Sequence, residues 1–164
     1  MNNIVLTSRG YSMVELVVTL ILAGILAAFV APRFFDLEVF QARGFYDEAL
    51  SILRYAHKTA IAQRRSVYVN LQPAAISACY TSTFPCSVAE GVPGPYGEKP
   101  YSVQAGGGTS SDTGKIIFFD ALGRPYNVDD IVPSSTFNAN LTLTITGGGK
   151  VRTITVEKET GYVR

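Results

Sequence analysis

Residues 8–32 of the chain read SRGYSMVELVVTLILAGILAAFVAP. No charged residue occurs between Leu16 and Pro32. At about 1.5 Å per residue, a helix over this run is about 25 Å long, just enough to cross the hydrocarbon core of a bilayer. The run therefore predicts a membrane-spanning helical segment over residues 11–33, ahead of a folded head over residues 34–164.

Two ordinary explanations of this run each leave a residue unexplained. A secretory signal peptide needs a short apolar core and a small-residue cleavage site, but Glu15 interrupts the apolar residues and Pro32 directly follows Ala31. A plain membrane anchor is compatible with the run. It requires Glu15 to reach back to the interface, because a carboxylate inside the bilayer is costly.

Residues 8–16 resemble the processing motif of type IV prepilins. The resemblance implies that residues 1–10 are a leader peptide and that a prepilin peptidase cuts between Gly10 and Tyr11, on the cytoplasmic side. It also implies that the new amino group of Tyr11 is methylated. Glu15 is then the fifth mature residue, where the family has a glutamate. The usual first residue is phenylalanine, and Tyr11 keeps an aromatic ring there.

The cut gives Glu15 a physical role. It creates an ammonium group at Tyr11 in a low-dielectric setting, where a buried charge needs a partner. The resemblance implies that Glu15 pairs with the ammonium of a neighbouring subunit during assembly. Arg9 precedes the apolar run and no early cluster of positive residues follows it, which favours a cytoplasmic N-terminus. We therefore expect a single-pass protein in the lipid of the inner membrane, with a periplasmic head that enters a filament.

A helical pattern continues beyond Pro32, at which many pilins carry a proline that bends the first helix. Apolar residues recur at three- and four-residue spacings, which predicts one helix from about Ser12 to about Arg64 with an amphipathic second half. The residues expected on its packed face are Leu37, Phe40, Ala49, Ile52, Leu53, Ala56 and Ala60.

The pattern then changes to the alternation that is typical of strands. Strands are predicted near residues 67–71, 76–80 and 115–120, and Gly147-Gly148-Gly149 joins two alternating runs in a predicted hairpin. Gly161 to Val163 is expected to add a short last strand. Residues between 85 and 111 are rich in proline and glycine and are expected to be loops. The fold class is therefore α+β, with a long N-terminal helix packed on an antiparallel sheet that has long loops, as in the pilin fold.

Cys79 and Cys86 bracket a short loop. In an oxidising periplasm they are expected to form a disulfide, although two free thiols remain possible. A zinc site would need more ligands than the two cysteines provide.

Composition and charge argue against several function classes. The formal net charge is +1 at pH 7, which gives no electrostatic case for binding nucleic acid. His57 is the sole histidine and has no nucleophile motif around it, so we expect a solvated helix residue and no enzyme or cofactor. The spacing of the aspartates matches no calcium loop, so no metal site is expected; these are Asp112, Asp120, Asp129 and Asp130.

The head resembles the GspH/FimT group of minor pilins and pseudopilins, on the strings Ile116–Pro125 and Ile154–Val163. Shorter strings around Pro32 and Arg43 resemble the MshC-type minor pilins of the mannose-sensitive haemagglutinin (MSHA) pilus. The resemblance implies a minor structural subunit that assembles with major and other minor pilins and supports pilus biogenesis and adhesion.

Two alternatives stay open. One is a pseudopilin of a type II secretion system, which the sequence does not separate from a pilus subunit. The other is a DNA-binding pilin for uptake. Some FimT-type pilins bind DNA through two arginines after a glycine near the C-terminus. Here Arg164 is the one arginine after Gly161.

Overall fold

The computed structural model describes residues 11–164, and for residues 30–36 it describes the backbone alone. The chain divides into two compact units, Met1–Asp36 and Leu37–Arg164. Helix α1, Met13–Gln63, contributes to both units and continues through Pro32. The prediction of one helix from about Ser12 to about Arg64 is confirmed.

Local chemistry explains where α1 begins and ends. At its start, the backbone N–H of Glu15 donates to the Ser12 hydroxyl (3.3 Å), so Ser12 caps the helix. At its end, Arg64 adopts a left-handed conformation with φ of 50°. The N–H groups of Arg64 and Arg65 return to the carbonyls of Ile61 and Ala60. This is a Schellman motif, with arginine at the position that glycine usually takes.

In the first unit, the side chains of residues 11–29 are exposed. No helix among the described residues combines the length and hydropathy required for crossing a membrane. The predicted span over residues 11–33 stays a prediction.

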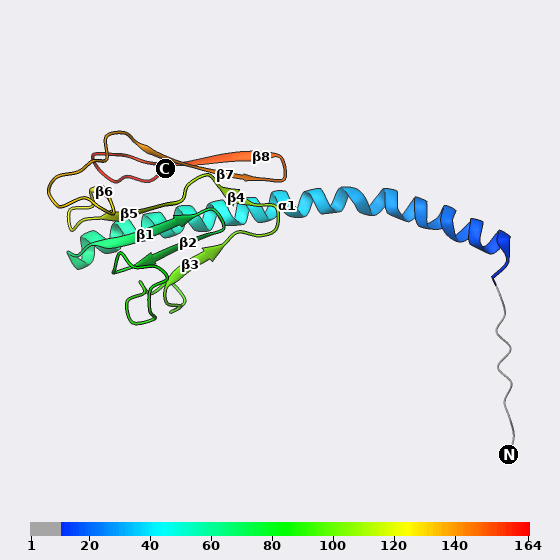
Figure 1. Ribbon diagram of the computed structural model, residues 1–164, viewed down its shortest axis with the longest axis horizontal. Coiled ribbons are helices and arrows are strands. Elements are labelled where there is room, and N and C mark those ends of the chain that lie inside the picture. The colour runs from blue at the N-terminus through cyan, green and yellow to red at the C-terminus, as the bar shows by residue number, and fades with distance from the viewer. Residues whose placement is uncertain (1–10) are drawn as a thin grey trace, which may run out of the picture. The chain divides into compact units, whose positions relative to one another are not determined.

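The second unit has two antiparallel sheets along the second half of α1 (Figure 1). The five-stranded sheet has the order β3-β2-β1-β5-β6, and the three-stranded sheet has the order β4-β7-β8. The strands are β1 Val67–Gln72, β2 Ala75–Cys79, β3 Tyr101–Gln104, β4 Ser110–Ser111, β5 Lys115–Phe119, β6 Pro125–Asn127, β7 Leu141–Gly147 and β8 Lys150–Val156.

The core lies between the helix and the two sheets. Alternate residues of the strands face it, as the period of two requires. The helix contributes the side chains along one of its faces. The core residues include Phe45, Ala49, Ile52, Leu53 and Ala56 from α1, Val67, Val69 and Leu71 from β1, Ile117 and Phe119 from β5, and Leu143, Ile145, Ile154 and Val156 from β7 and β8.

Two residues that were predicted to lie on the packed face of the helix are exposed, so the prediction is wrong for them. Leu37 is 53% exposed and Phe40 is 75% exposed, whereas Ala42 and Phe45 are buried. Each helical residue turns the chain by about 100°, so Phe40 lies about 200° from Ala42, on the opposite face. Spacing alone allowed both registers, and the sheets select the one that begins at Ala42.

The predicted hairpin is confirmed as β7 and β8, in which Gly147 pairs with Lys150. Gly148 and Gly149 have φ of 56° and 70°, as a two-residue type I′ turn requires. A Cβ at Gly148 would lie 2.5 Å from Val39 Cγ2 and 2.7 Å from Val39 N. The turn therefore approaches α1 at a distance that only glycine permits.

Three short strands are not among those that the sequence predicts. β3 and β4 occur in the proline- and glycine-rich stretch, and β6 directly follows the turn at Gly123. β3 and β4 form by pairing with strands distant in the sequence, β2 and β7, and β6 forms by pairing with β5 across a tight turn. The expected last strand is reduced to a single bridge between Val163 and Val156.

Candidate functional site

The predicted processing site lies at the edge of the described chain. Gly10 lies outside the described residues. Tyr11 is 82% exposed, and Glu15 is exposed in the first turn of α1, where the positive end of the helix dipole favours a carboxylate. The cap at Ser12 was not predicted. It could have been predicted from the sequence, because Ser12-Met13-Val14-Glu15 has the spacing of a capping box.

Between Leu16 and Phe29, helix α1 exposes large apolar side chains on all of its faces. Glu15 is the sole charged residue between Tyr11 and Phe29. A helix that is apolar all round is normally covered by lipid or by other chains. The large exposed side chains include Leu16, Val17, Val18, Leu20, Ile21, Leu22, Ile25, Leu26 and Phe29.

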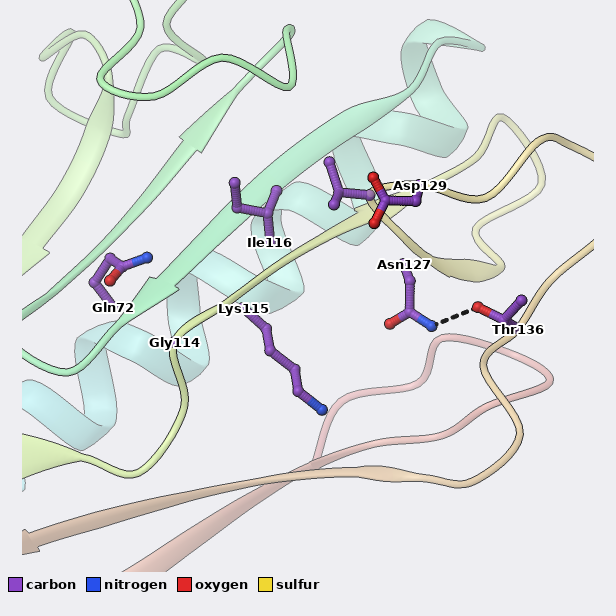
Figure 2. Close-up of a pocket in the computed structure, with 8 residues that line it drawn as sticks. Gln72, Gly114, Lys115, Ile116, Asn127, Asp129 and Thr136 are labelled. Atoms are coloured by element: carbon purple, nitrogen blue, oxygen red, sulfur yellow. Dashed lines mark hydrogen bonds between the residues drawn. The ribbon is translucent and has the colours of Figure 1, made fainter.

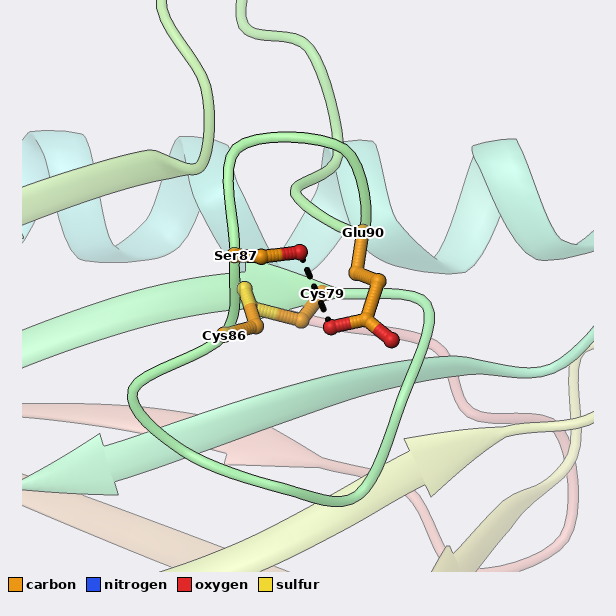
Figure 3. The surroundings of a disulfide bond; sticks show 4 residues. All are labelled: Cys79, Cys86, Ser87 and Glu90. Atoms are coloured by element: carbon orange, nitrogen blue, oxygen red, sulfur yellow. Dashed lines mark hydrogen bonds between the residues drawn. A yellow bond between two sulfur atoms is a disulfide. The ribbon is translucent and has the colours of Figure 1, made fainter.

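In the head, Cys79 and Cys86 form the predicted disulfide. Figure 3 shows the loop that the disulfide closes, beside Ser87 and Glu90. The Ser87 hydroxyl donates to Glu90 Oε2 (3.0 Å), and the Tyr80 N–H donates to the Glu90 carbonyl (2.8 Å). The disulfide therefore closes the loop, and the hydrogen bond from Tyr80 to Glu90 joins it to the segment that follows.

The string at 116–125 that resembles minor pilins forms the β5–β6 turn. The Asp120 side chain is 6% exposed, and its Oδ1 accepts the backbone N–H groups of Leu122 (2.9 Å) and Arg124 (2.8 Å). Its Oδ2 accepts the Arg124 guanidinium (3.1 Å). The carboxylate therefore stabilises the turn.

Two other aspartates also serve as loop acceptors. Burial opposes the ionisation of Asp112, but hydrogen bonds from Thr144 and Thr113 outweigh it and hold the pKa of Asp112 below its ordinary value. The pKa of Asp130 is lowered in the same way, because hydrogen bonds from Thr136 and Asn127 outweigh burial. Within residues 11–164, no three potential ligands gather at a metal site.

The C-terminal residues are fixed to α1. Arg54 Nε donates to the Val163 carbonyl (3.1 Å), and His57 Nε2 lies 3.2 Å from the Thr160 carbonyl oxygen. The His57 ring also packs edge-on against Phe119, with 5.4 Å between the ring centroids. His57, expected to be a solvated helix residue, is half-buried, because the chain end covers part of it. Sequence spacing carries no signal for contacts over more than 100 positions.

A polar pocket is lined by residues of the five-stranded sheet and of the segment that follows β6. Figure 2 shows Gln72 of β1, Lys115 of β5 and Asn127 of β6 among the residues that line it. Asn127 Nδ2 donates to the Thr136 hydroxyl (2.8 Å), which in turn donates to Asp130 Oδ1 (2.6 Å). The lining combines amides, a hydroxyl, one ammonium group and the Asp129 carboxylate.

Comparison with known proteins identifies the fold. No protein-family profile and no curated protein sequence matches the chain. The crystal structure of the type IV minor pilin FimU of Pseudomonas aeruginosa (strain PAO1) is similar, with a TM-score of 0.52 and 15% identity, over 74% of this chain and 85% of that chain. A second crystal form of FimU gives a TM-score of 0.49, 17% identity and coverage of 74% and 90%. The minor pseudopilin EpsH from the Type 2 Secretion System of Vibrio cholerae gives a TM-score of 0.48, 14% identity and coverage of 77% and 94%.

The likeness to FimU, at 15% identity, concerns the fold. It agrees with the architecture described above, in which a long N-terminal helix packs on antiparallel sheet. The predicted α+β class is confirmed, and the chain has the fold of a type IV minor pilin.

Proposed function

We propose that the chain is a minor structural subunit of a type IV, MSHA-like pilus that supports pilus biogenesis and adhesion. A prepilin peptidase cuts the precursor between Gly10 and Tyr11, and the amino group of Tyr11 is methylated. The subunit resides in the inner membrane as a single-pass protein, with a cytoplasmic N-terminus and a periplasmic head. It then assembles with major and other minor pilins.

One observation carries this proposal: an apolar helix, exposed all round, with a single carboxylate one turn from the proposed cut. Such a surface needs lipid before assembly and other helices after it. Glu15 then faces the new ammonium group of a neighbouring subunit. In this apolar setting, an unpaired charge costs several kcal/mol, so the pair selects the correct stagger between subunits.

Glu15→Ala tests the role of the carboxylate, with Thr19→Ala as the control one helical turn further on. We expect both variants to be cut, with an intact mass that begins at Tyr11. We expect Glu15→Ala to lower recovery in sheared filaments at least about a hundredfold, because it leaves a buried ammonium unpaired. Wild-type recovery of Glu15→Ala would contradict the proposal.

Gly10→Ser tests the cleavage site itself. The larger side chain at the position before the cut is expected to block processing, so the membrane form should keep the mass of the full precursor. A mature form that begins at Tyr11 in this variant would refute the assignment.

A pseudopilin of a type II secretion system shares this precursor and helix, so the two functions differ in their partners. Purification of the mature subunit from membranes separates them. The pilus proposal requires that it copurifies with a major pilin, and copurification with secretion pseudopilins alone would replace it.

A further inference from the structure

The outer side of β8 is partly occupied by the chain's own C-terminus. β8 is an edge strand of the three-stranded sheet, and Figure 1 shows it as the outermost strand (orange). The Thr155 N–H donates to the Arg164 carbonyl (2.7 Å), and the Arg164 N–H returns to the Thr155 carbonyl (3.0 Å). The Glu157 N–H donates to the Tyr162 carbonyl (2.9 Å). The end of the chain therefore pairs antiparallel with residues 155–157.

Nearer the hairpin turn, backbone groups on the outer side of β8 are left without a partner from the described chain. In an antiparallel ladder, residues two apart direct their N–H and C=O groups to the same side. Because the N–H and C=O groups of Thr155 point away from β7, those of Thr153 and Val151 do so as well. Among the described residues, no backbone group pairs with them on that side. Their side chains are exposed, Val151 by 64%.

This open edge differs from the other sheet edges of the described chain. Proteins normally shorten exposed edges or place proline on them, because open edges pair with other chains. β3 has 4 residues, β4 has 2, and β6 has 3 and begins with Pro125. β8 has 7 residues and no proline, and the chain end leaves Lys150–Thr153 of it open.

The charge along the open edge is positive. Lys150 and Arg152 lie on either side of Val151, and neither forms an ion pair with a described residue. Arg152 Nη1 is also shielded from solvent without a hydrogen-bond partner in the described structure. The edge therefore favours a partner segment that carries a carboxylate opposite Arg152.

We propose that β8 between Lys150 and Thr153 binds an extended acidic segment of a neighbouring pilin-type subunit, which adds a strand to the sheet. The partner continues, along the same edge, the antiparallel pairing that the C-terminal residues begin. Strand addition supplies main-chain hydrogen bonds, and the side chains at alternate positions supply specificity. That the partner is a pilin-type subunit rests on the proposed function, whereas the strand addition itself is argued from the edge of β8.

A second copy of the same strand is the poorer occupant. Antiparallel self-pairing that joins Val151 to Thr153 of the other copy places the two Arg152 residues directly opposite each other. Like charges at opposed positions destabilise a strand pair. The edge chemistry therefore selects a different, acidic strand.

Photo-crosslinking in the full chain tests the edge. A benzophenone amino acid replaces Val151, and the matched control replaces Val88, which is 67% exposed in a loop. Cells are irradiated, and adducts from both membranes and sheared filaments are mapped by mass spectrometry. We expect the probe at 151 to label an acidic extended segment of another pilin-type subunit, and the probe at 88 not to label that segment.

Three variants, each combined with the probe at 151, examine the cause of the labelling. Thr153→Pro removes an outward N–H and leaves the bonds to β7 intact, so the adduct yield should fall about tenfold. Arg152→Glu should lower it similarly, whereas Lys115→Glu, the same charge change on the other sheet, should leave it unchanged. Retained protease resistance shows that each variant is folded.

The inference is overturned if the probe at 151 gives no adduct, if the adduct maps to a second copy of β8 or to a helix, or if Thr153→Pro leaves the yield unchanged. Absence of the unmodified chain from sheared filaments counts instead against the proposed function. The membrane adducts test the edge in either case.

Discussion

Replacing Asp120 by alanine should destabilise the head through the β5–β6 turn. The carboxylate is almost fully buried and accepts two backbone N–H groups and the Arg124 guanidinium. A hydrogen bond to a charged group contributes about 1.5–3 kcal/mol, but Leu122 is 72% exposed and its freed N–H can reach water. The Arg124 side chain is 41% exposed, so the ion pair adds less than about 1 kcal/mol.

The sum for Asp120→Ala is a loss of about 3–4 kcal/mol in the free energy of unfolding. In a head of this size, each kcal/mol lowers Tm by roughly 3 °C, so the melting temperature should fall by about 10 °C. Asp120→Asn is the control. Its amide oxygen can still accept both backbone N–H groups, so it loses mainly the ion pair and should cost about 1 kcal/mol.

Near-UV circular dichroism of the full chain in detergent measures both transitions. The chain has 9 tyrosines and no tryptophan. Tyr126, beside the turn, stacks on Phe118 with 5.1 Å between the centroids, so its signal reports on this region. Equal shifts for the alanine and asparagine variants would refute the assigned role of the backbone hydrogen bonds. A shift below about 2 °C for alanine would refute the role of the carboxylate altogether.

Three further changes test other parts of the head. Replacing Cys79 and Cys86 by serine opens a short loop and should cost about 2–3 kcal/mol in a denaturant titration; an unchanged midpoint would contradict this. Asp112 has a pKa held below its ordinary value of 3.8. Its stabilisation is therefore present above that pH and lost as the pH falls below it, and Asp112→Asn should flatten the pH dependence of Tm in this acid range. Gly148→Val introduces a side chain at φ of 56° against the backbone of α1 and should lower stability by more than about 2 kcal/mol. Gly107→Ala, where a Cβ meets no atom within 4 Å, should be close to neutral in the same melting experiment.

The sequence alone determined the elements whose signals are local. Helix α1 follows from a long run of helical spacing between Ser12 and Arg64, and the β7–β8 hairpin follows from alternation around a glycine turn. The disulfide between Cys79 and Cys86 was predicted from their proximity in the chain and from the expected oxidising compartment. The processing prediction likewise depends on contiguous residues.

The tertiary structure decided everything that depends on distant partners. It selected Ala42 rather than Phe40 for the core, because two helical registers fit the same spacing and only the sheets distinguish them. It formed β3, β4 and β6, which are too short to have a periodic signal of their own and exist through pairing. It also placed the chain end on the outer side of β8, because hydrogen-bond partners across a sheet edge leave no trace in local sequence.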